Sequence, residues 1–199
     1  APRGRPAHAT RAGAPPQRAP RRPAALRPAG GIDASPTEAV YGLGCDPLNR
    51  AAVQRLLALK GRPSEKGLIL IADDLLRLAP FLGPLTPKMR ERVDPSWPGP
   101  VTWLLPARPE TPHWLRGNHA SLAVRVTAHP MAAALCAAFG GPLVSTSANP
   151  SGRPPARSPL QVRLRCPGVD LVVHGPTGDL IKPTPIRDAL SGDTIRSGR

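Results

Sequence analysis

An α/β domain, with helices packed on a twisted sheet, is the fold class that this sequence predicts. Strand-like and helix-like segments alternate along the chain after residue 29. Residues 67–72 form a continuous apolar run of strand length, which is typical of a strand covered on both faces. A chain of 199 residues can bury one sizeable core, and since only 3% of its residues are aromatic, Leu, Val, Ile and Ala must fill that core.

Three helices have recognisable ends. The first begins after Asn49, a good N-cap, and ends at Gly61, and its apolar residues recur at helical spacing, at positions 52, 53, 56 and 57. Asp73 or Asp74 can cap a second helix that is rich in leucine and extends to residue 82. A third is predicted over residues 131–139, because two glycines follow it directly.

Short apolar segments predict the remaining strands of the sheet. They are residues 101–105, 122–126, 143–145 and 171–173. Strands that alternate with helices in this way favour a single α/β domain.

Positive charge occurs along the whole chain. The formal net charge is +14, and residues 1–30 contribute seven arginines and no acidic residue. A basic body indicates an anionic substrate or a nucleic acid as partner. Residues 1–28 are rich in arginine and proline and have little apolar surface to bury, so we predict a disordered tail and one folded domain over residues 29–199. An RNA-contacting arm, a transit-like leader and a dispensable extension are all compatible with such a tail.

Several protein classes are not supported by the sequence. No apolar run approaches the ~18 residues that span a bilayer, and no continuous apolar segment follows the first arginines, so we expect neither a membrane protein nor a secretory signal. Three cysteines without CxxC spacing indicate buried thiols in a reducing cytosol. The histidines show no metal spacing, and GxxxxGKS/T, GxSxG and HExxH motifs do not occur, so zinc chemistry and covalent catalysis are unsupported.

Residues 143–152 carry the strongest functional signal. They run from a short apolar strand into small hydroxyl residues, an amide and a glycine. Ser145, Ser147 and Asn149 alternate, so that they can point to one face. Ligands of open α/β sheets bind outside the carboxyl ends of strands, which is where this segment falls. An ordinary loop of serine, asparagine, proline and glycine is the alternative.

A basic segment, Lys60-Gly-Arg62-Pro63, follows the first helix. A lysine and an arginine two residues apart, stiffened by proline, suit phosphate oxygens, which arginine can bind two at a time. A solvated cationic helix end is the alternative, since helix C-termini attract cations. Together with the hydroxyl residues of 143–152, this pair predicts a nucleotide site without a glycine-rich phosphate loop.

Two further features are less specific. Thr37 is followed by Gly42 and Gly44, which would let the backbone turn sharply and approach a ligand closely, although any glycine-rich turn looks similar. Arg125 lies in an otherwise apolar alternating segment, and because charged residues are rarely buried unpaired, we expect it to meet a carboxylate. The pattern leaves open whether that carboxylate is an internal Asp or Glu or belongs to a ligand.

Six motifs occur in order along the chain. They are Pro-Thr-Glu at 36–38, Tyr-Gly-Leu-Gly at 41–44, Lys-Gly-Arg-Pro at 60–63, Trp-Pro-Gly-Pro-Val-Thr at 97–102, Ala-Val-Arg at 123–125 and Ser-Ala-Asn-Pro-Ser-Gly at 147–152. In this combination the chain resembles the YrdC/TsaC family of threonylcarbamoyl-AMP synthases, over roughly residues 36–199. The resemblance is to the short form, and it implies an α/β fold with an open twisted mixed sheet and packed helices around a basic concave cavity.

The resemblance implies a nucleotidyltransferase. Such an enzyme joins L-threonine, bicarbonate and ATP, which carries Mg²⁺, into L-threonylcarbamoyladenylate and releases pyrophosphate. Partner proteins then transfer the threonylcarbamoyl group to the adenosine next to the anticodon in ANN-decoding tRNAs. A cytoplasmic protein that contacts tRNA or double-stranded RNA, without a metal site of its own, is therefore expected.

The same resemblance assigns roles to single residues. Lys60 and Arg62 would be the catalytic pair that holds the triphosphate. The ATP site would comprise Lys60, Arg62, Ser64, Ser121, Ser147, Asn149 and Arg196. Threonine would be held by Thr37, Arg125, Ser145 and Thr184, with Arg125 pairing with its carboxylate.

Two stretches depart from the family pattern. Asp33 and Ser35 stand where an apolar strand normally leads to Thr37, and both are poor fillers for a central strand. Pro185 removes a strand donor after Thr184. An alternative interpretation is an RNA-binding or ribosome-maturation protein of the same fold with weak or lost catalysis. A second alternative, a carbamoyl-adenylate former of the hydrogenase-maturation type, lacks support because zinc-finger cysteines do not occur.

Overall fold

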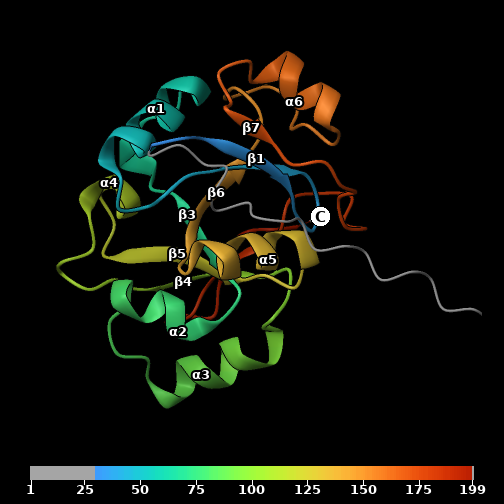
Figure 1. Ribbon diagram of the computed structural model, residues 1–199. Coiled ribbons are helices and arrows are strands. Elements are labelled where there is room, and N and C mark those ends of the chain that lie inside the picture. Colours follow the sequence, from blue (N-terminus) through green and yellow to red (C-terminus); the bar gives the residue numbers. More distant parts are fainter. Residues whose placement is uncertain (1–29, 199) are drawn as a thin grey trace, which may run out of the picture.

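Within the described part of the chain, a mixed sheet of nine strands organises the fold (Figure 1). The computed structural model describes residues 30–198, so the tail predicted over residues 1–28 lies outside the described residues. The strand order is β7-β1-β2-β6-β3-β5-β4-β8-β9. The strands are β1 (Asp33–Pro36), β2 (Tyr41–Gly44), β3 (Ile69–Ala72), β4 (Thr102–Pro106), β5 (Ser121–Val126), β6 (Leu143–Ser147), β7 (Leu171–Val172), β8 (Ile186–Asp188) and β9 (Thr194–Arg196). This architecture confirms the predicted α/β class with an open mixed sheet.

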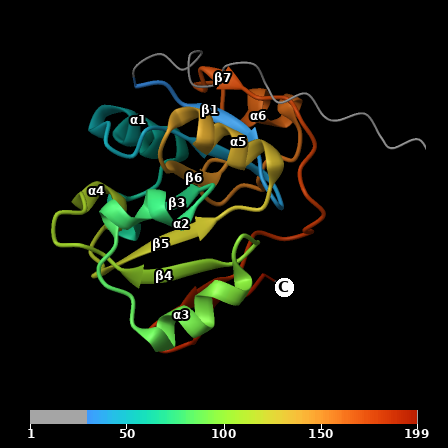
Figure 2. The ribbon, with the colours of Figure 1, turned by 60° about the horizontal axis from the view of Figure 1, so that its bottom comes forward.

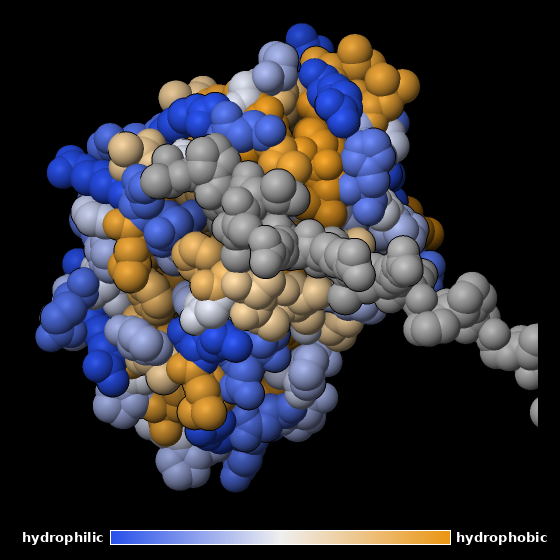
Figure 3. Space-filling view, in the orientation of Figure 1, coloured by the Kyte–Doolittle hydropathy of each residue, from blue (hydrophilic) through white to orange (hydrophobic). Residues whose placement is uncertain are grey.

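Six helices of the described residues surround the sheet (Figures 1 and 2). They are α1 (Arg50–Lys60), α2 (Leu75–Leu78), α3 (Pro87–Val93), α4 (His113–Arg116), α5 (Pro130–Phe139) and α6 (Pro159–Arg165), with 3₁₀ turns at Ser64–Lys66, Ala79–Phe81 and Asp94–Ser96. Helix α5 packs against β1 and β3, α1 contacts α4, and α6 lies next to β7. In the space-filling view hydrophobic side chains gather over α6, where Leu160 and Leu164 are exposed (Figure 3).

Local capping decides where the first helices begin. The Asn49 side chain accepts a hydrogen bond from the Ala52 amide at 3.0 Å, and Gly61 ends α1 in the left-handed conformation, so both predicted ends are confirmed. The Asp74 side chain caps α2 in the same way. This second helix ends at Leu78 rather than near residue 82, because Pro80 has no amide proton and its ring would clash with the carbonyl four residues earlier.

Strand β3 is buried on both faces, as its apolar sequence predicts. Leu70 and Ala72 belong to the main core, together with the fully buried Trp103 of β4. Ile71 faces the other way, into a smaller cluster with residues of α5 such as Leu135. Alternate side chains of one strand therefore join two separate apolar clusters.

The N-terminal hairpin differs from its prediction. The glycines 42 and 44 lie within β2 and not in a turn, and the turn itself spans residues 37–40. Asp33 and Ser35 are buried in β1, which has only the two-residue strand β7 between it and the sheet edge. Asp33 stands opposite Gly44 in the register, and a Cβ at Gly44 would lie 2.9 Å from the Asp33 carboxylate. Glycine is the residue that leaves room for this acidic side chain.

Helices α3, α4 and α6 were not predicted from the sequence. Each has seven residues or fewer and buries at most two side chains, so its hydrophobic periodicity is too short to recognise. Thr86 followed by Pro87, and Ser158 followed by Pro159, were the available signals, because a capping hydroxyl before proline is typical of a helix start.

We predict that Leu70→Ala lowers the free energy of unfolding by about 2–5 kcal/mol, because it leaves a cavity in the core. Leu76→Ala is the matched control, since the Leu76 side chain is 79% exposed while that of Leu70 is 0% exposed. The control should stay within about 0.5 kcal/mol of the parent protein. Urea unfolding measures both, and equal midpoints for the two variants would contradict the assignment of β3 to the core.

Candidate active site

A cavity of about 500 Å³ brings together segments that are far apart in the sequence. Ten of the eleven predicted site residues line it, namely Thr37, Lys60, Arg62, Ser121, Arg125, Ser145, Ser147, Asn149, Thr184 and Arg196. Ser64 does not line it and lies half-buried at the start of the 3₁₀ turn after Arg62. The predicted residues therefore form one site with this single exception.

The cavity wall is strongly cationic. Its basic residues are Lys60, Arg62, Lys66, Arg116, Arg125 and Arg196, and no aspartate or glutamate is among the lining residues. Burial lowers the pKa of Arg62, and burial together with the charges of Arg125 and Arg62 lowers the pKa of Arg196. The charge of Arg62 lowers the pKa of both Lys60 and Arg196, and a cavity in which cations repel one another attracts a polyanion, because each negative group relieves that repulsion.

Lys60 connects the two segments that the sequence singled out. Its ammonium group donates to the carbonyl oxygens of Ser147 at 2.5 Å and Asn149 at 2.8 Å. Its own carbonyl accepts from the Ser151 amide at 2.8 Å. Burial, followed by the charge of Arg62, lowers the pKa of Lys60 to about 8. An ammonium group has three protons, so one donor remains for a ligand in the cavity.

Arg62 and Arg196 reach the cavity from segments that lie far apart in the sequence. Arg62 uses Nε and one terminal nitrogen on the Gly67 carbonyl, at 3.3 and 3.0 Å, and its other terminal nitrogen is not used in this contact. Arg196 lies in β9, opposite Ile186 of β8, and its guanidinium donates to the Thr184 carbonyl at 2.7 Å. Both guanidinium groups are thus held in place by backbone carbonyls.

Small hydroxyl groups also line the cavity, next to the contacts of Lys60. Ser145 and Ser147 lie two apart in β6, so they share one face, and Asn149 follows the end of the strand. Gly42 of the neighbouring β2 is needed for close approach, since a Cβ there would lie 3.0 Å from the Ser145 hydroxyl and 3.3 Å from the Thr37 methyl group. Asn149 donates to two loop carbonyls and is fixed by them.

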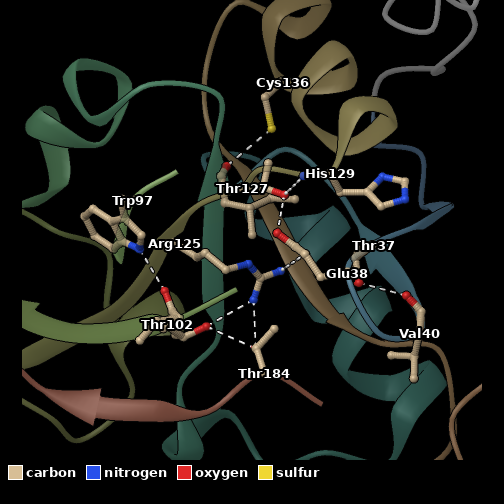
Figure 4. A network of polar contacts seen from close by, with 12 residues as sticks. Thr37, Glu38, Val40, Trp97, Thr102, Arg125, Thr127, His129, Cys136 and Thr184 are labelled. Atoms are coloured by element: carbon tan, nitrogen blue, oxygen red, sulfur yellow. Dashed lines mark hydrogen bonds and ion pairs between the residues drawn. The ribbon is translucent and has the colours of Figure 1, made fainter. Parts of the chain in front are cut away.

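Arg125 meets an internal carboxylate, which answers the question that its sequence left open (Figure 4). Its terminal nitrogen Nη2 lies 3.3 Å from Glu38 Oε2, and Nη1 donates to the hydroxyl groups of Thr102 and Thr184, each at 3.0 Å. The Arg125 side chain is 5% exposed. Burial is the main reason why the pKa of Arg125 is lowered, and the charge of Glu38 opposes that effect.

Sequence analysis did not single out Glu38, Thr102 or Thr127 as separate functional residues. Thr127 donates its hydroxyl proton to Glu38 at 2.6 Å, and both residues are buried. Glu38 and Thr102 do lie within the motifs at 36–38 and 97–102, and an acidic residue in a buried motif was the available signal. Their contacts join different strands, so spacing along the chain cannot reveal them.

The described part of the chain gives three further findings that bear on function. Cys45, Cys136 and Cys166 are buried, as predicted. Among residues 30–198, no group of three or more histidine, cysteine or acidic residues is arranged to hold a metal ion. In the same range none of the helices combines the length and the apolar character required to cross a bilayer.

Comparison with known proteins gives consistent matches. Residues 25–198 match the Sua5/YciO/YrdC family, which is described as "Telomere recombination". A threonylcarbamoyl-AMP synthase of Halorhodospira halophila is 60% identical over 169 residues, which cover 84% of this chain and 88% of that protein. One from Nitrosococcus oceani is 55% identical over 168 residues, or 84% and 91% of the two proteins. The crystal structure of P. abyssi Sua5 complexed with L-threonine superposes on this chain with a TM-score of 0.75 at 30% identity, over 80% of this chain and 47% of that one.

We predict that Lys60→Met weakens the binding of ATP on the order of tenfold or more, because a charge-assisted hydrogen bond contributes roughly 1.5–3 kcal/mol. Lys88→Met, at an exposed position of α3, is the matched control. Isothermal titration calorimetry measures both affinities, and equal values in the two variants would show that Lys60 only holds the loop.

The pH dependence of Lys60 has a definite sign. With a pKa of about 8 in the folded protein, the ammonium loses its proton above pH 8, so ATP affinity should fall from pH 7.5 to 9.5 in the parent protein and not in Lys60→Met. From about pH 8 to the ordinary lysine value of 10.5 the unfolded chain binds more protons, so this group makes the protein more stable as pH rises through that window. An ATP affinity that falls equally in both proteins would contradict the assignment.

Proposed function

This chain belongs to the Sua5/YciO/YrdC family, and from that premise we propose that it is a threonylcarbamoyl-AMP synthase. It would form L-threonylcarbamoyladenylate from L-threonine, bicarbonate and the magnesium complex of ATP. The single observation that carries the proposal is the cavity wall, which has six basic residues, no acidic residue, and hydroxyl and amide groups beside them. A triphosphate and a small amino acid need this combination of charge and hydrogen-bonding groups.

The nucleotide would occupy the part of the cavity that is lined by the Lys60 loop together with the end of β6. Lys60 and Arg62 would neutralise the triphosphate, and Ser147 and Asn149, which adjoin Lys60, would orient it. Arg196 and Ser121 line the same cavity and would complete the ATP site. Ser64 would join it only through a shift of its 3₁₀ turn, since it does not line the cavity here.

Threonine would occupy the end of the cavity near Arg125. Arg125 would bind the carboxylate of the amino acid, and Thr37, Ser145 and Thr184 would contact the remainder of the molecule. The relative that was crystallised with L-threonine supports a threonine site in this fold.

The chemistry requires positioning and charge neutralisation and no protein nucleophile. The threonine amine would combine with bicarbonate to form a carbamate and release water, and a carbamate oxygen would attack the α-phosphorus. The bond from that phosphorus to the bridging oxygen of the β-phosphate would break, and pyrophosphate would leave. Negative charge develops on the departing pyrophosphate, where Lys60 and Arg62 can stabilise it.

The product would serve a tRNA modification. We propose a cytoplasmic enzyme whose adenylate is used by partner proteins to modify the adenosine next to the anticodon of ANN-decoding tRNAs. The relatives' name and the basic character of the chain support this role. Direct contact with tRNA or double-stranded RNA is a further part of the proposal, since a net charge of +14 attracts nucleic acid.

The proposal predicts that the purified protein releases pyrophosphate from ATP only when bicarbonate and threonine are both present. Incubation with labelled threonine, followed by chromatography of the adenylate and by a coupled pyrophosphate assay, measures this. Serine and alanine serve as control amino acids. A protein that gives no threonine-dependent pyrophosphate is not a synthase of this kind.

Arg62→Gln should lower kcat/KM for ATP by about 100-fold or more, because catalytic phosphate-binding charges typically contribute several kcal/mol to the transition state. Arg90→Gln, which breaks only an exposed ion pair with Asp94 on α3, should leave kcat/KM unchanged. Similar kinetics for the two variants would mean that the basic loop is a solvated helix end.

Binding of RNA without turnover is the alternative function that the net charge of +14 favours. Such binding would weaken steeply with salt, because phosphate contacts release counterions, and it would not respond to threonine. Salt-dependent RNA binding by a protein without threonine-dependent turnover would therefore favour this alternative.

A further inference from the structure

Glu38 is an acidic residue buried directly behind the wall of the cavity. Its side chain is 9% exposed, and it does not line the cavity, although its neighbours Thr37 and Ala39 do. The segment around Gly178 holds its backbone, because the Gly178 amide donates to the Thr37 carbonyl at 2.9 Å. A Cβ at Gly178 would lie 2.5 Å from the Glu38 carbonyl oxygen, so only glycine allows this approach.

One oxygen of the Glu38 carboxylate is fixed from the side away from the cavity (Figure 4). The Thr127 hydroxyl donates to Oε1 at 2.6 Å and itself accepts from the His129 amide at 3.2 Å. A threonine hydroxyl has one proton to donate. Because Thr127 accepts a hydrogen bond from the His129 amide, this proton remains available for Glu38. The orientation of the carboxylate is thereby determined by Thr127, which lies between β5 and α5.

The second oxygen of Glu38 faces Arg125. Oε2 lies 3.3 Å from Arg125 Nη2 and has no hydrogen-bond partner among the described residues. Thr102 and Thr184 hold the opposite side of the guanidinium through Nη1. The Nε donor of Arg125 is likewise buried without a hydrogen-bond partner in the described part of the chain. Arg125 is therefore held on two sides and keeps an unused donor.

Charge balance requires a carboxylate at this place. A buried guanidinium with only neutral hydroxyl partners is unfavourable, because those groups replace the water around the charge incompletely. The Coulomb attraction of Glu38 opposes the effect of burial on Arg125. Glu38 thus balances the charge of the buried guanidinium and favours one orientation of it at the edge of the cavity.

We propose that Glu38 is a positioning residue for threonine recognition, which it serves by holding Arg125 in the orientation that receives the carboxylate of the amino acid. The proposal rests on the proposed function, and Glu38 itself does not touch the substrate. Thr127 supports the same arrangement, since its hydroxyl group orients the Glu38 carboxylate, which in turn orients Arg125. The nucleotide site does not use the pair, so the effect should be confined to threonine.

Glu38→Gln tests the proposal in the full chain, because it keeps the shape and the acceptor for Thr127 and removes only the charge. KM for threonine should rise on the order of tenfold or more, while KM for ATP stays within about twofold, since a charge-assisted contact is the one that is lost. Glu91→Gln, the same substitution at an exposed position of α3, is the matched control. Calorimetric titration with threonine measures the affinity without turnover.

Two further variants separate positioning from a merely structural role. Thr127→Val keeps the shape of the side chain and removes the hydrogen bond to Oε1, so it should raise KM for threonine by about threefold to tenfold. In an Arg125→Gln background, Glu38→Gln should have no further effect on threonine affinity, because its partner is already gone. If Glu38→Gln does not fold, KM for threonine in Thr127→Val tests the positioning role by itself.

The outcomes are distinguishable. A parent protein without threonine-dependent pyrophosphate release would overturn both the proposed function and this inference. An active parent protein would overturn the inference alone if Glu38→Gln and Thr127→Val kept the parent KM for threonine. Equal increases in KM for threonine and ATP, or full additivity with Arg125→Gln, would also overturn it, since either result means that Glu38 does not act through Arg125.

Discussion

The contact between the Lys60 ammonium and the carbonyl oxygens of Ser147 and Asn149 joins the two sides of the cavity. One side is the end of α1, and the other is the loop that leaves β6. Because Lys60 also accepts from the Ser151 amide, the two segments are connected at three points. A lysine at a helix end is ordinarily hydrated at no cost in free energy, but Lys60 is buried. Its burial therefore indicates that holding the charge in one position contributes more than hydrating it.

The cavity concentrates positive charge, and its cationic side chains have two different kinds of partner. Lys60, Arg62 and Arg196 are partnered by backbone carbonyls, which orient a cation without neutralising it. Arg125 is partnered by the carboxylate of Glu38, which does neutralise it. The first three cations therefore suit a polyanion with several charges, while Arg125, whose charge is already balanced, keeps an Nε donor that is unpartnered among the described residues for one further acceptor. This division supports the proposal that one cavity without acidic lining residues takes two chemically different substrates.

The sheet register gives the site its shape. Gly42 pairs with Ser147, and Ser145 pairs with Ile69, so β6 presents its hydroxyl groups between two strands from distant parts of the chain. A shift by one residue would turn Ser145 and Ser147 to the opposite face. The small side chain of Gly42 is part of the same arrangement, because a Cβ there would crowd both Ser145 and Thr37.

The sequence by itself determined the α/β class, both ends of α1, the buried strand β3 and the residue types of the site, because capping, apolar runs and short motifs act over a few neighbouring residues. It also paired the segment of Lys60 with residues 143–152. Only the tertiary structure decided that Glu38 is the carboxylate that meets Arg125, that residues 41–44 form a strand, and that Ser64 lies outside the cavity. These outcomes depend on strand order and register, which bring distant residues together through packing and leave no periodic signal along the chain.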